Sequence, residues 1–282
     1  MTRTLRTPTS AVGRPRPNLT LIGELVRRDI VGRYRGSVLG IFWSLLTPLF
    51  MLAVFTFVFG TVLQTRWVHS ADGPNAAAAA QPSIAEFAII LFAGLIVFQL
   101  FAEVINRAPS LIYTNVNYVK KVVFPLEILP VVALGSAAFH ACISLAVLFV
   151  FKIAVTGHVP WTALLFPFVM APYLVLILGL AWFLASFGTY VRDVGQVLAP
   201  LVTALMFLSP IFFPLAALPA WIRPWVALNP VALPVEQARE VLILGRVPDF
   251  FALAVYTVVA LGIAALGFIW FQKTRRGFAD VL

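Results

Sequence analysis

The sequence predicts an all-α integral membrane protein, and three observations predict it: composition, the length of the apolar runs and the placement of charge. Hydrophobic residues make up 61% of the 282 residues and charged residues 11%, whereas soluble domains are closer to about 45–50% apolar and about 25% charged. A soluble core of this composition would leave too much apolar surface in water. We therefore expect a polytopic membrane protein without a large soluble domain beside its spans.

The N-terminal part divides into a tail and a helix. Residues 1–18 are rich in Thr, Pro and Arg, and without apolar periodicity they predict a disordered cytoplasmic tail and no secretory signal peptide. Residues 19–36 predict an amphipathic helix at the membrane surface, although an ordinary solvated helix stays open as an alternative. Its i,i+4 charge pairs are Glu24–Arg28 and Asp29–Arg33. Its apolar stripe consists of Leu19, Ile22, Val26, Ile30 and Tyr34.

The rest of the chain, 37–282, predicts a single transmembrane domain. Each of six apolar segments is long enough to cross about 30 Å of hydrocarbon at about 1.5 Å per residue. Prolines inside them are more tolerable in membrane helices than in soluble ones. The segments run roughly over 38–63, 86–106, 123–151, 161–189, 194–213 and 250–271.

The segment 214–249, between the fifth and sixth spans, predicts a different structure. Six prolines exclude one full-length helix. The segment is nevertheless apolar, and Trp221 and Trp225 suit a membrane interface. We expect two short re-entrant helices on the outer side. Backbone at that depth must be covered by protein or face a water-filled cavity, so the segment indicates a conduit.

Charge placement predicts the orientation. With the N-terminus in the cytoplasm, 15 Lys and Arg residues lie inside and five lie outside, so both termini are expected in the cytoplasm. The net charge of +9 is thus better explained by membrane orientation than by nucleic acid, because the charges cap apolar runs and form no single basic face.

Several kinds of chemistry are absent from the sequence. No phosphate-loop motif occurs, so we expect no nucleotide or other cofactor in this chain. The lone Cys142 and the scattered His69, His140 and His158 predict neither a disulfide nor a metal site, and the histidines are expected to be loop or packing residues. Acidic residues near predicted helix ends, Glu103 among them, are expected to be solvated and not a proton relay. If transport is driven, another polypeptide must supply the energy.

Five blocks of sequence resemble one family of transporters. The first is GRYRGSVLGIFWSLLTPLFMLAVFTFVFG, entering the first span, and the second is NVNYVKKVVFPLEILPV at 115–131. SPIFFP at 209–214, ALNP at 227–230 and RRGFADVL at 275–282 follow in order. Together they resemble the permeases of ABC type-2 exporters, specifically the bacterial polysaccharide and O-antigen export family. The stretch 70–82 is less typical of it.

The resemblance implies an assembly and a substrate. It implies six transmembrane helices per protomer, two protomers around a central channel, and two copies of a cytosolic ABC ATPase subunit that binds the ATP. The substrate would be a polysaccharide on a polyprenyl diphosphate lipid in the bacterial inner membrane. Exporters of teichoic acid, capsule or a small amphiphile remain alternatives. So do a self-contained channel or secondary carrier, and a membrane-bound structural or lipid-modifying protein.

Three groups of candidate site residues follow from it. Arg33 and Arg35, at the headgroup level, are candidates for the lipid diphosphate or a gate, since phosphates need charge-assisted partners; orientation and anionic-lipid contact are the alternative. The loop Arg107–Val122 would couple to the ATPase through Ser110, Tyr113 and Asn117, or would simply anchor two helices. Aromatic faces could line a sugar channel or merely pack or face lipid: Phe42, Trp43, Phe50, Phe207 and Phe212.

Overall fold

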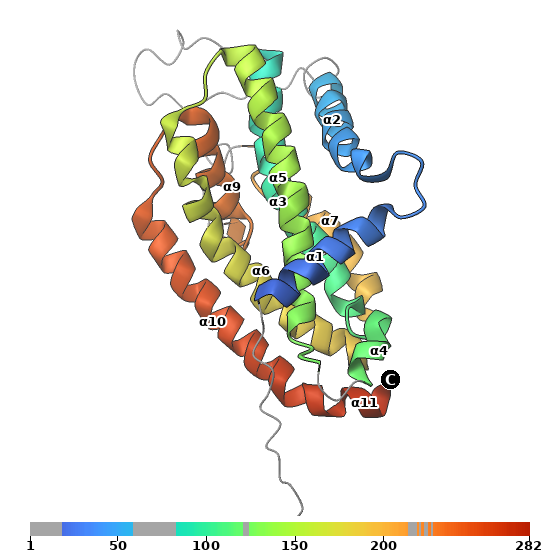
Figure 1. Cartoon of the computed structure of the whole chain (residues 1–282). Helices are drawn as coiled ribbons and strands as arrows, with labels where there is room; N and C mark the ends of the chain where they lie inside the picture. The colour runs from blue at the N-terminus through green and yellow to red at the C-terminus, as the bar shows by residue number, and fades with distance from the viewer. Residues whose placement is uncertain are drawn as a thin grey trace, which may run out of the picture.

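The protein folds as an elongated bundle of helices (Figure 1). The computed structural model describes residues 19–58, 83–120, 124–213, 219, 221–222, 225–226 and 228–282. Across these ranges the secondary structure is helical, without strands. The predicted tail, the stretch 70–82 and most of 214–227 lie outside the described residues.

Helix α3 (Ile84–Arg107) is the central helix of the bundle. Ser83 begins it with a capping box, in which the Ser83 hydroxyl accepts from the Glu86 amide and the Glu86 carboxylate accepts from the Ser83 amide. Helices α5 (Ile128–Thr156), α6 (Phe166–Tyr190), α7 (Val194–Leu208) and α9 (Ala232–Arg239) pack around it. Their contacts bury almost the whole length of α3 inside the protein.

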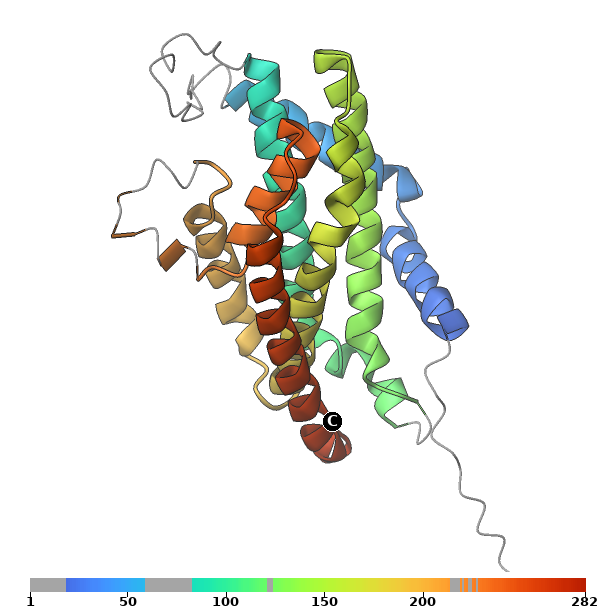
Figure 2. The same cartoon turned by 90° about the vertical axis from the view of Figure 1, so that its left-hand side faces the viewer.

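The most extensive helix–helix contact joins α6 to α10 (Phe250–Thr274), and the two helices run side by side in both views (Figures 1 and 2). Gly179 and Gly267 form the closest point of contact. A methyl group added at Gly267 would lie 2.1 Å from the carbonyl oxygen of Gly179. Lipid is as apolar as these helices, so small residues that let backbones approach supply much of the packing attraction.

Five described helical segments are long and apolar enough to cross a membrane. They are Gly40–Val58, Ile84–Ser110, Ile128–Thr156, Trp161–Tyr190 and Phe250–Val281. The expected fifth span, α7, is apolar but has only 15 residues, which amounts to about 22 Å of helix. The described helices therefore show a multi-pass membrane protein. By helix length, five of the six predicted spans are confirmed among the described residues, and α7 is too short to be counted as the sixth.

The N-terminal helix α1 (Leu19–Tyr34) lies across α5, and a short link joins it to η1 (Gly40–Phe42) and α2 (Trp43–Phe55) (Figure 1). In the link, Gly36 and Gly40 have φ of 86° and 53°, which favours glycine. The predicted apolar stripe is only partly correct. Ile30 is buried, but Leu19 is 83% exposed and Leu25, outside the stripe, is buried. The face of α1 that packs on the bundle includes Leu25, because Leu25 contacts Ile128 and Val132 of α5.

The described residues before α10 form short helical pieces and no long helix, which agrees with the number of prolines there. Helix α9 packs against α3 and α6 and ends in a π-helical turn, η8 (Glu240–Leu244). The chain ends with the turn η9 (Arg275–Gly277) and helix α11 (Phe278–Val281). Helix α11, helix α4 (Val116–Val119) and the lower half of α6 gather at one end of the bundle (Figure 1).

Candidate substrate and coupling site

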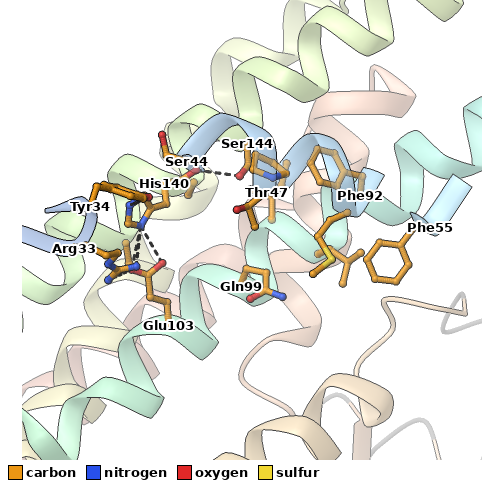
Figure 3. A pocket seen from close by; sticks show the side chains of 16 residues that line it. Arg33, Tyr34, Ser44, Thr47, Phe55, Phe92, Gln99, Glu103, His140 and Ser144 are labelled. Atoms are coloured by element: carbon orange, nitrogen blue, oxygen red, sulfur yellow. Dashed lines mark hydrogen bonds and ion pairs between the residues drawn. The ribbon is translucent and has the colours of Figure 1, made fainter. Parts of the chain in front are cut away.

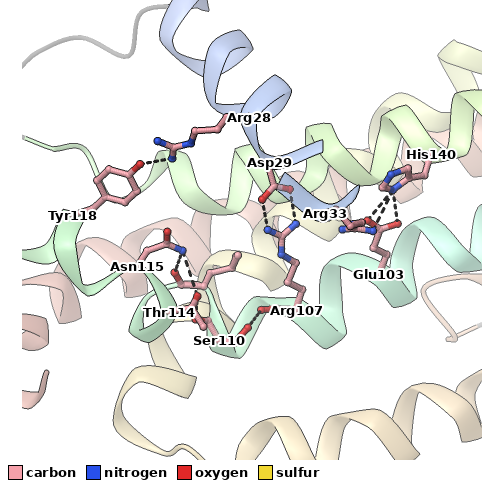
Figure 4. A network of polar contacts seen from close by, with 11 residues as sticks. Arg28, Asp29, Arg33, Glu103, Arg107, Ser110, Thr114, Asn115, Tyr118 and His140 are labelled. Atoms are coloured by element: carbon pink, nitrogen blue, oxygen red, sulfur yellow. Dashed lines mark hydrogen bonds and ion pairs between the residues drawn. The ribbon is translucent and has the colours of Figure 1, made fainter. Parts of the chain in front are cut away.

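Charged side chains attach α1 to the C-terminal half of α3 (Figure 4). Asp29 accepts two hydrogen bonds from Arg107, one of them 2.6 Å long. Arg33 lies 2.7 Å from Glu103. Since Glu103 and Arg107 are one turn apart on α3, they face α1 together. Both members of the predicted Asp29–Arg33 pair thus form ion pairs with α3, and the positive charge of Arg33 still helps to lower the pKa of Asp29.

The pair of Asp29 with Arg107 holds Asp29 ionised. Burial by itself would raise the pKa of Asp29. The hydrogen bonds and positive charge of Arg107 oppose that effect and outweigh it, and the pKa ends below its ordinary value. Asp29 is thus an anionic anchor for α1 at neutral pH.

Glu103 is the centre of a polar cluster that sequence reasoning missed. Its carboxylate lies 3.1 Å from His140 Nδ1 on α5, and His140 Nε2 is 3.0 Å from the Tyr34 hydroxyl. The expectation that Glu103 is a solvated carboxylate and that His140 merely packs is wrong. The helix end was placed correctly, but α1 folds over it and covers it. The one signal in the sequence that could have indicated this cluster is the presence of an acid, Glu103, and a histidine, His140, within apolar runs.

This cluster closes one end of a cavity of about 380 Å³ between α2, α3 and α5 (Figure 3). Phe55 and Phe92 lie toward the other end, and polar side chains lie between. The polar lining consists of Arg33, Tyr34, Ser44, Thr47, Gln99, Glu103, His140 and Ser144.

A second, open cavity lies between α1 and the start of the first span. Its volume is about 800 Å³, and Arg27, Arg28 and Arg35 line it. Among the described residues Arg35 has no acidic partner, whereas Arg33 is paired with Glu103. The two arginines predicted to act together therefore line different cavities. Tyr34, between them in sequence, lines both.

The predicted coupling segment is helical but divided into short pieces. After α3 come η4 (Ala108–Ser110), η5 (Tyr113–Asn115) and α4. The Ser110 hydroxyl donates to the Arg107 carbonyl at 2.8 Å, Tyr113 is half-buried and Asn117 is exposed. The segment is attached to the bundle on both sides.

Its attachments combine backbone packing, the buried side chains of Leu111 and Ile112, and contacts of Tyr118. Pro109 packs on α6, where a methyl group added at Gly188 would lie 2.5 Å from it. Tyr118 accepts a hydrogen bond from Arg28 of α1, and its ring stacks on Phe124 at 4.3 Å (Figure 4). Tyr113 and Asn117 are left on the surface.

The five predicted channel aromatics are not one group. Phe42 of η1 and Trp43 and Phe50 of α2 are exposed, and none of them lines the cavity. Phe207 and Phe212 stack on each other at 5.7 Å near the end of α7. Among the described residues, no contact joins the two sets.

Several of the five sequence blocks meet in space through polar contacts. Asn229 of ALNP donates to Ser209 of SPIFFP at 2.8 Å, and Arg239 of α9 donates to the Ile211 carbonyl at 2.6 Å. Glu127 of the second block pairs with Arg275 of the last at 2.7 Å. Blocks far apart in the sequence thus form two local clusters.

A family of transporters described as ABC-2 type transporter matches residues 20–243 of this chain, a range that includes α1, the cavity between α2, α3 and α5, and the Ser209–Asn229 contact. The chain belongs to the ABC-2 type transporter family. Membership confirms the family expected from the five sequence blocks, and with it a transport subunit and not an enzyme.

Individual ABC-2 transporters align along nearly the whole chain. The O-antigen export system permease protein RfbA of Myxococcus xanthus is 27% identical over 265 residues, covering 92% of this chain and 94% of its own. RfbA of Klebsiella pneumoniae is 22% identical, covering 93% and 95%. The polysialic acid transport protein KpsM of Escherichia coli is 24% identical over 246 residues, covering 85% and 89%.

Proposed function

We propose that this chain is the permease subunit of an exporter that moves a polyprenyl-diphosphate-linked polysaccharide, O antigen or a related surface glycan, across the bacterial inner membrane. The names of the relatives support a polysaccharide, since three similar proteins export O antigen or polysialic acid and align along most of both chains. The chain's ABC-2 membership supports ATP hydrolysis by a separate subunit.

The proposed assembly has two copies of this chain and two ATPase subunits. Each chain crosses the membrane six times, with α7 and the residues after it forming the fifth crossing and α9 belonging to a re-entrant segment. The many exposed apolar residues of α2 and α7, such as Phe50 and Phe207, support a second copy or lipid against these faces. The ATPase would contact the segment with Ser110, Tyr113 and Asn117.

The observation that carries the proposal is the basic cavity beside α1. Arg27, Arg28 and Arg35 line an open space at the junction of α1 with the first span, where three basic residues outnumber the one acid, Glu24. A lipid diphosphate in the inner leaflet would lie at this level, and guanidinium groups bind phosphate oxygens in pairs. Because Arg33 is already paired with Glu103, we assign the diphosphate contact to Arg35 and leave Arg33 the role of holding α1.

Single variants test this division. Arg35→Gln should reduce surface glycan, because each charge-assisted hydrogen bond contributes about 1.5–3 kcal/mol, while the amount and thermal stability of the protein stay unchanged. Arg33→Gln should instead lower stability. Surface glycan is measured on gels beside fluorescence-detected unfolding. Adding two arginines in the 3–16 tail should not rescue Arg35→Gln, whereas rescue would show that the charge serves orientation alone.

Polysialic acid is the second candidate substrate, and the similarity to the polysialic acid transport protein KpsM favours it. Teichoic acid and small amphiphiles have no relative among the proteins aligned above. Deleting the gene and asking which surface polymer disappears separates these substrates. Loss of no polymer would contradict polysaccharide export itself.

A further inference from the structure

Helix α3 carries two polar side chains on an otherwise buried surface. From Phe87 to Ile105 every residue is buried except Gln99 and Glu103. These two lie one turn apart and share one face of the helix. Both line the cavity between α2, α3 and α5. The exposed strip of the central helix therefore coincides with the wall of that cavity.

Gln99 lies deep within the span. It follows Ile84 by about 22 Å of helix and precedes Arg107 by about 12 Å. Within the described ranges its side-chain amide has no hydrogen-bond partner, and the residue is exposed to the cavity. An amide without a partner is costly in hydrocarbon. The cavity at this depth consequently suits a polar occupant.

The lining favours a neutral ligand rich in hydroxyl groups. Arg33 and Glu103 neutralise each other at 2.7 Å, so the cavity offers no excess charge to an anion. The Thr47 and Ser144 hydroxyls donate to carbonyls of their own helices at 2.9 and 3.0 Å, which leaves their oxygens free to accept. The Gln99 amide can both donate and accept.

The far end of the cavity offers apolar faces, Phe55 and Phe92 (Figure 3). Sugar rings combine such apolar faces with a rim of hydroxyls, and a volume of about 380 Å³ falls in the range of small-molecule sites. An acyl chain would leave Gln99 unsatisfied, so lipid alone fits less well.

We propose that this cavity binds the sugar units next to the diphosphate, with Gln99 as a residue that hydrogen-bonds them. The inference rests on the proposed function. It also uses the position of Tyr34, which lines both this cavity and the basic cavity of Arg35. A diphosphate held in the basic cavity would place its first sugars beside that shared wall.

The first test compares a change in the cavity with a change elsewhere on α3. Gln99→Leu removes the amide at similar volume and makes α3 more apolar, so insertion is preserved. The matched control, Ile90→Leu, alters a buried apolar residue of the same helix that does not line the cavity. In the complex with its ATPase in lipid nanodiscs, lipid-linked glycan should stimulate ATP hydrolysis at about three- to tenfold higher concentration for Gln99→Leu only. Equal stimulation of wild type and Gln99→Leu would overturn the proposal.

The second test identifies the occupant directly. A photo-reactive benzoylphenylalanine is placed at position 99, and at Val258, which is 71% exposed on α10, as the control. Irradiated cells should yield a glycan-bearing adduct at 99 and none at 258. A phospholipid adduct without sugar at 99 would overturn the proposal and assign the cavity to lipid.

The two proposals fail in different ways. If gene deletion leaves every surface glycan unchanged, the proposed function fails. If deletion abolishes a glycan but Gln99→Leu exports it normally and position 99 captures no sugar, the function stands and the cavity assignment fails.

Discussion

Asp29 and Arg107 show how single residues fix α1 to the bundle, and we predict the cost of separating them. Asp29→Asn leaves a half-buried guanidinium without its anion and should reduce stability at pH 7 by about 1–3 kcal/mol. Thermal unfolding of the purified protein measures the loss. Glu24→Gln, an exposed acid on the same helix, is the matched control and should change little.

The same pair makes the loss depend on pH. The pKa of Asp29 is lower in the folded protein than its ordinary value of 3.8, so the ionised pair contributes stability above about pH 4. That contribution disappears as pH falls through the folded-state pKa. The difference between wild type and Asp29→Asn should therefore be constant from pH 5 to 7 and shrink in stronger acid. A difference that grows on acidification would contradict this account.

At the scale of residues, the ion-pair partners could not be predicted from the sequence, because they are distant in the chain. The i,i+4 spacing gave Asp29 a plausible partner in Arg33, yet the structure pairs both with α3. Local spacing cannot rank a neighbour on the same helix against one that tertiary packing brings closer. In the same way, Arg33 and Arg35 are nearly adjacent in sequence, but residues two apart point to different sides of a helix end.

At the scale of elements, the close contact of α6 with α10 depends on glycine. Two matched substitutions of glycines on α10 test this dependence. Gly267→Val places a side chain against the Gly179 carbonyl. Overpacking costs about 1–3 kcal/mol where side chains can yield, and a backbone yields less, so we expect a clear loss of thermal stability. Gly262→Val, where nothing lies within 4 Å, should leave stability unchanged. Equal effects would show that helix propensity alone matters.

The segment after α3 carries the prediction for the ATPase. Tyr113→Asp puts a charge on a half-buried surface position and should reduce copurification of the ATPase severalfold without altering insertion. Val247→Asp, at an exposed position after η8, controls for a general effect of surface charge. Unchanged copurification and export with Tyr113→Asp would leave the segment a simple anchor.

Elements were predicted well where the apolar run was long, and poorly where packing decides the length. The segments around α3, α5, α6 and α10 were placed within a few residues. The run predicted as 194–213 is equally apolar, but its helix ends at Leu208 because Ser209 and Pro210 turn the chain toward Asn229 and Arg239. Hydropathy cannot register such a turn.

For the whole molecule, charge asymmetry was foreseen, and burial sharpens it. Of the five positive residues assigned to the outside, Lys152 and Arg239 are buried, at 3% and 7% exposure. Lys152 donates to the Ile243 carbonyl and Arg239 to the Ile90 carbonyl. These two charges bond to backbone carbonyls, so the face that is expected to lie outside would be even less basic than the count from the sequence.

The end of the bundle that holds α4 and α11 is, by contrast, rich in basic residues. Arg107, Lys120, Arg192, Lys273 and Arg276 lie there or on the segments leading to it. Charge placed this unequally orients membrane proteins with the basic end in the cytoplasm. We therefore predict that α4 and α11 face the cytoplasm and that the turn after η8 faces the periplasm.

The single native cysteine makes this orientation testable by labelling intact cells. In a Cys142→Ser background, Asn117→Cys and Val247→Cys each place one thiol on an exposed position at opposite ends. A membrane-impermeant maleimide should label position 247 in intact cells and position 117 only after the inner membrane is opened. Positions 117 and 247 are both exposed in the folded protein. Labelling at either position therefore reports the side of the membrane on which the thiol lies, and it does not require local unfolding. Labelling of 117 in intact cells, with 247 protected, would invert the orientation and would move the proposed diphosphate cavity to the wrong leaflet for an exporter.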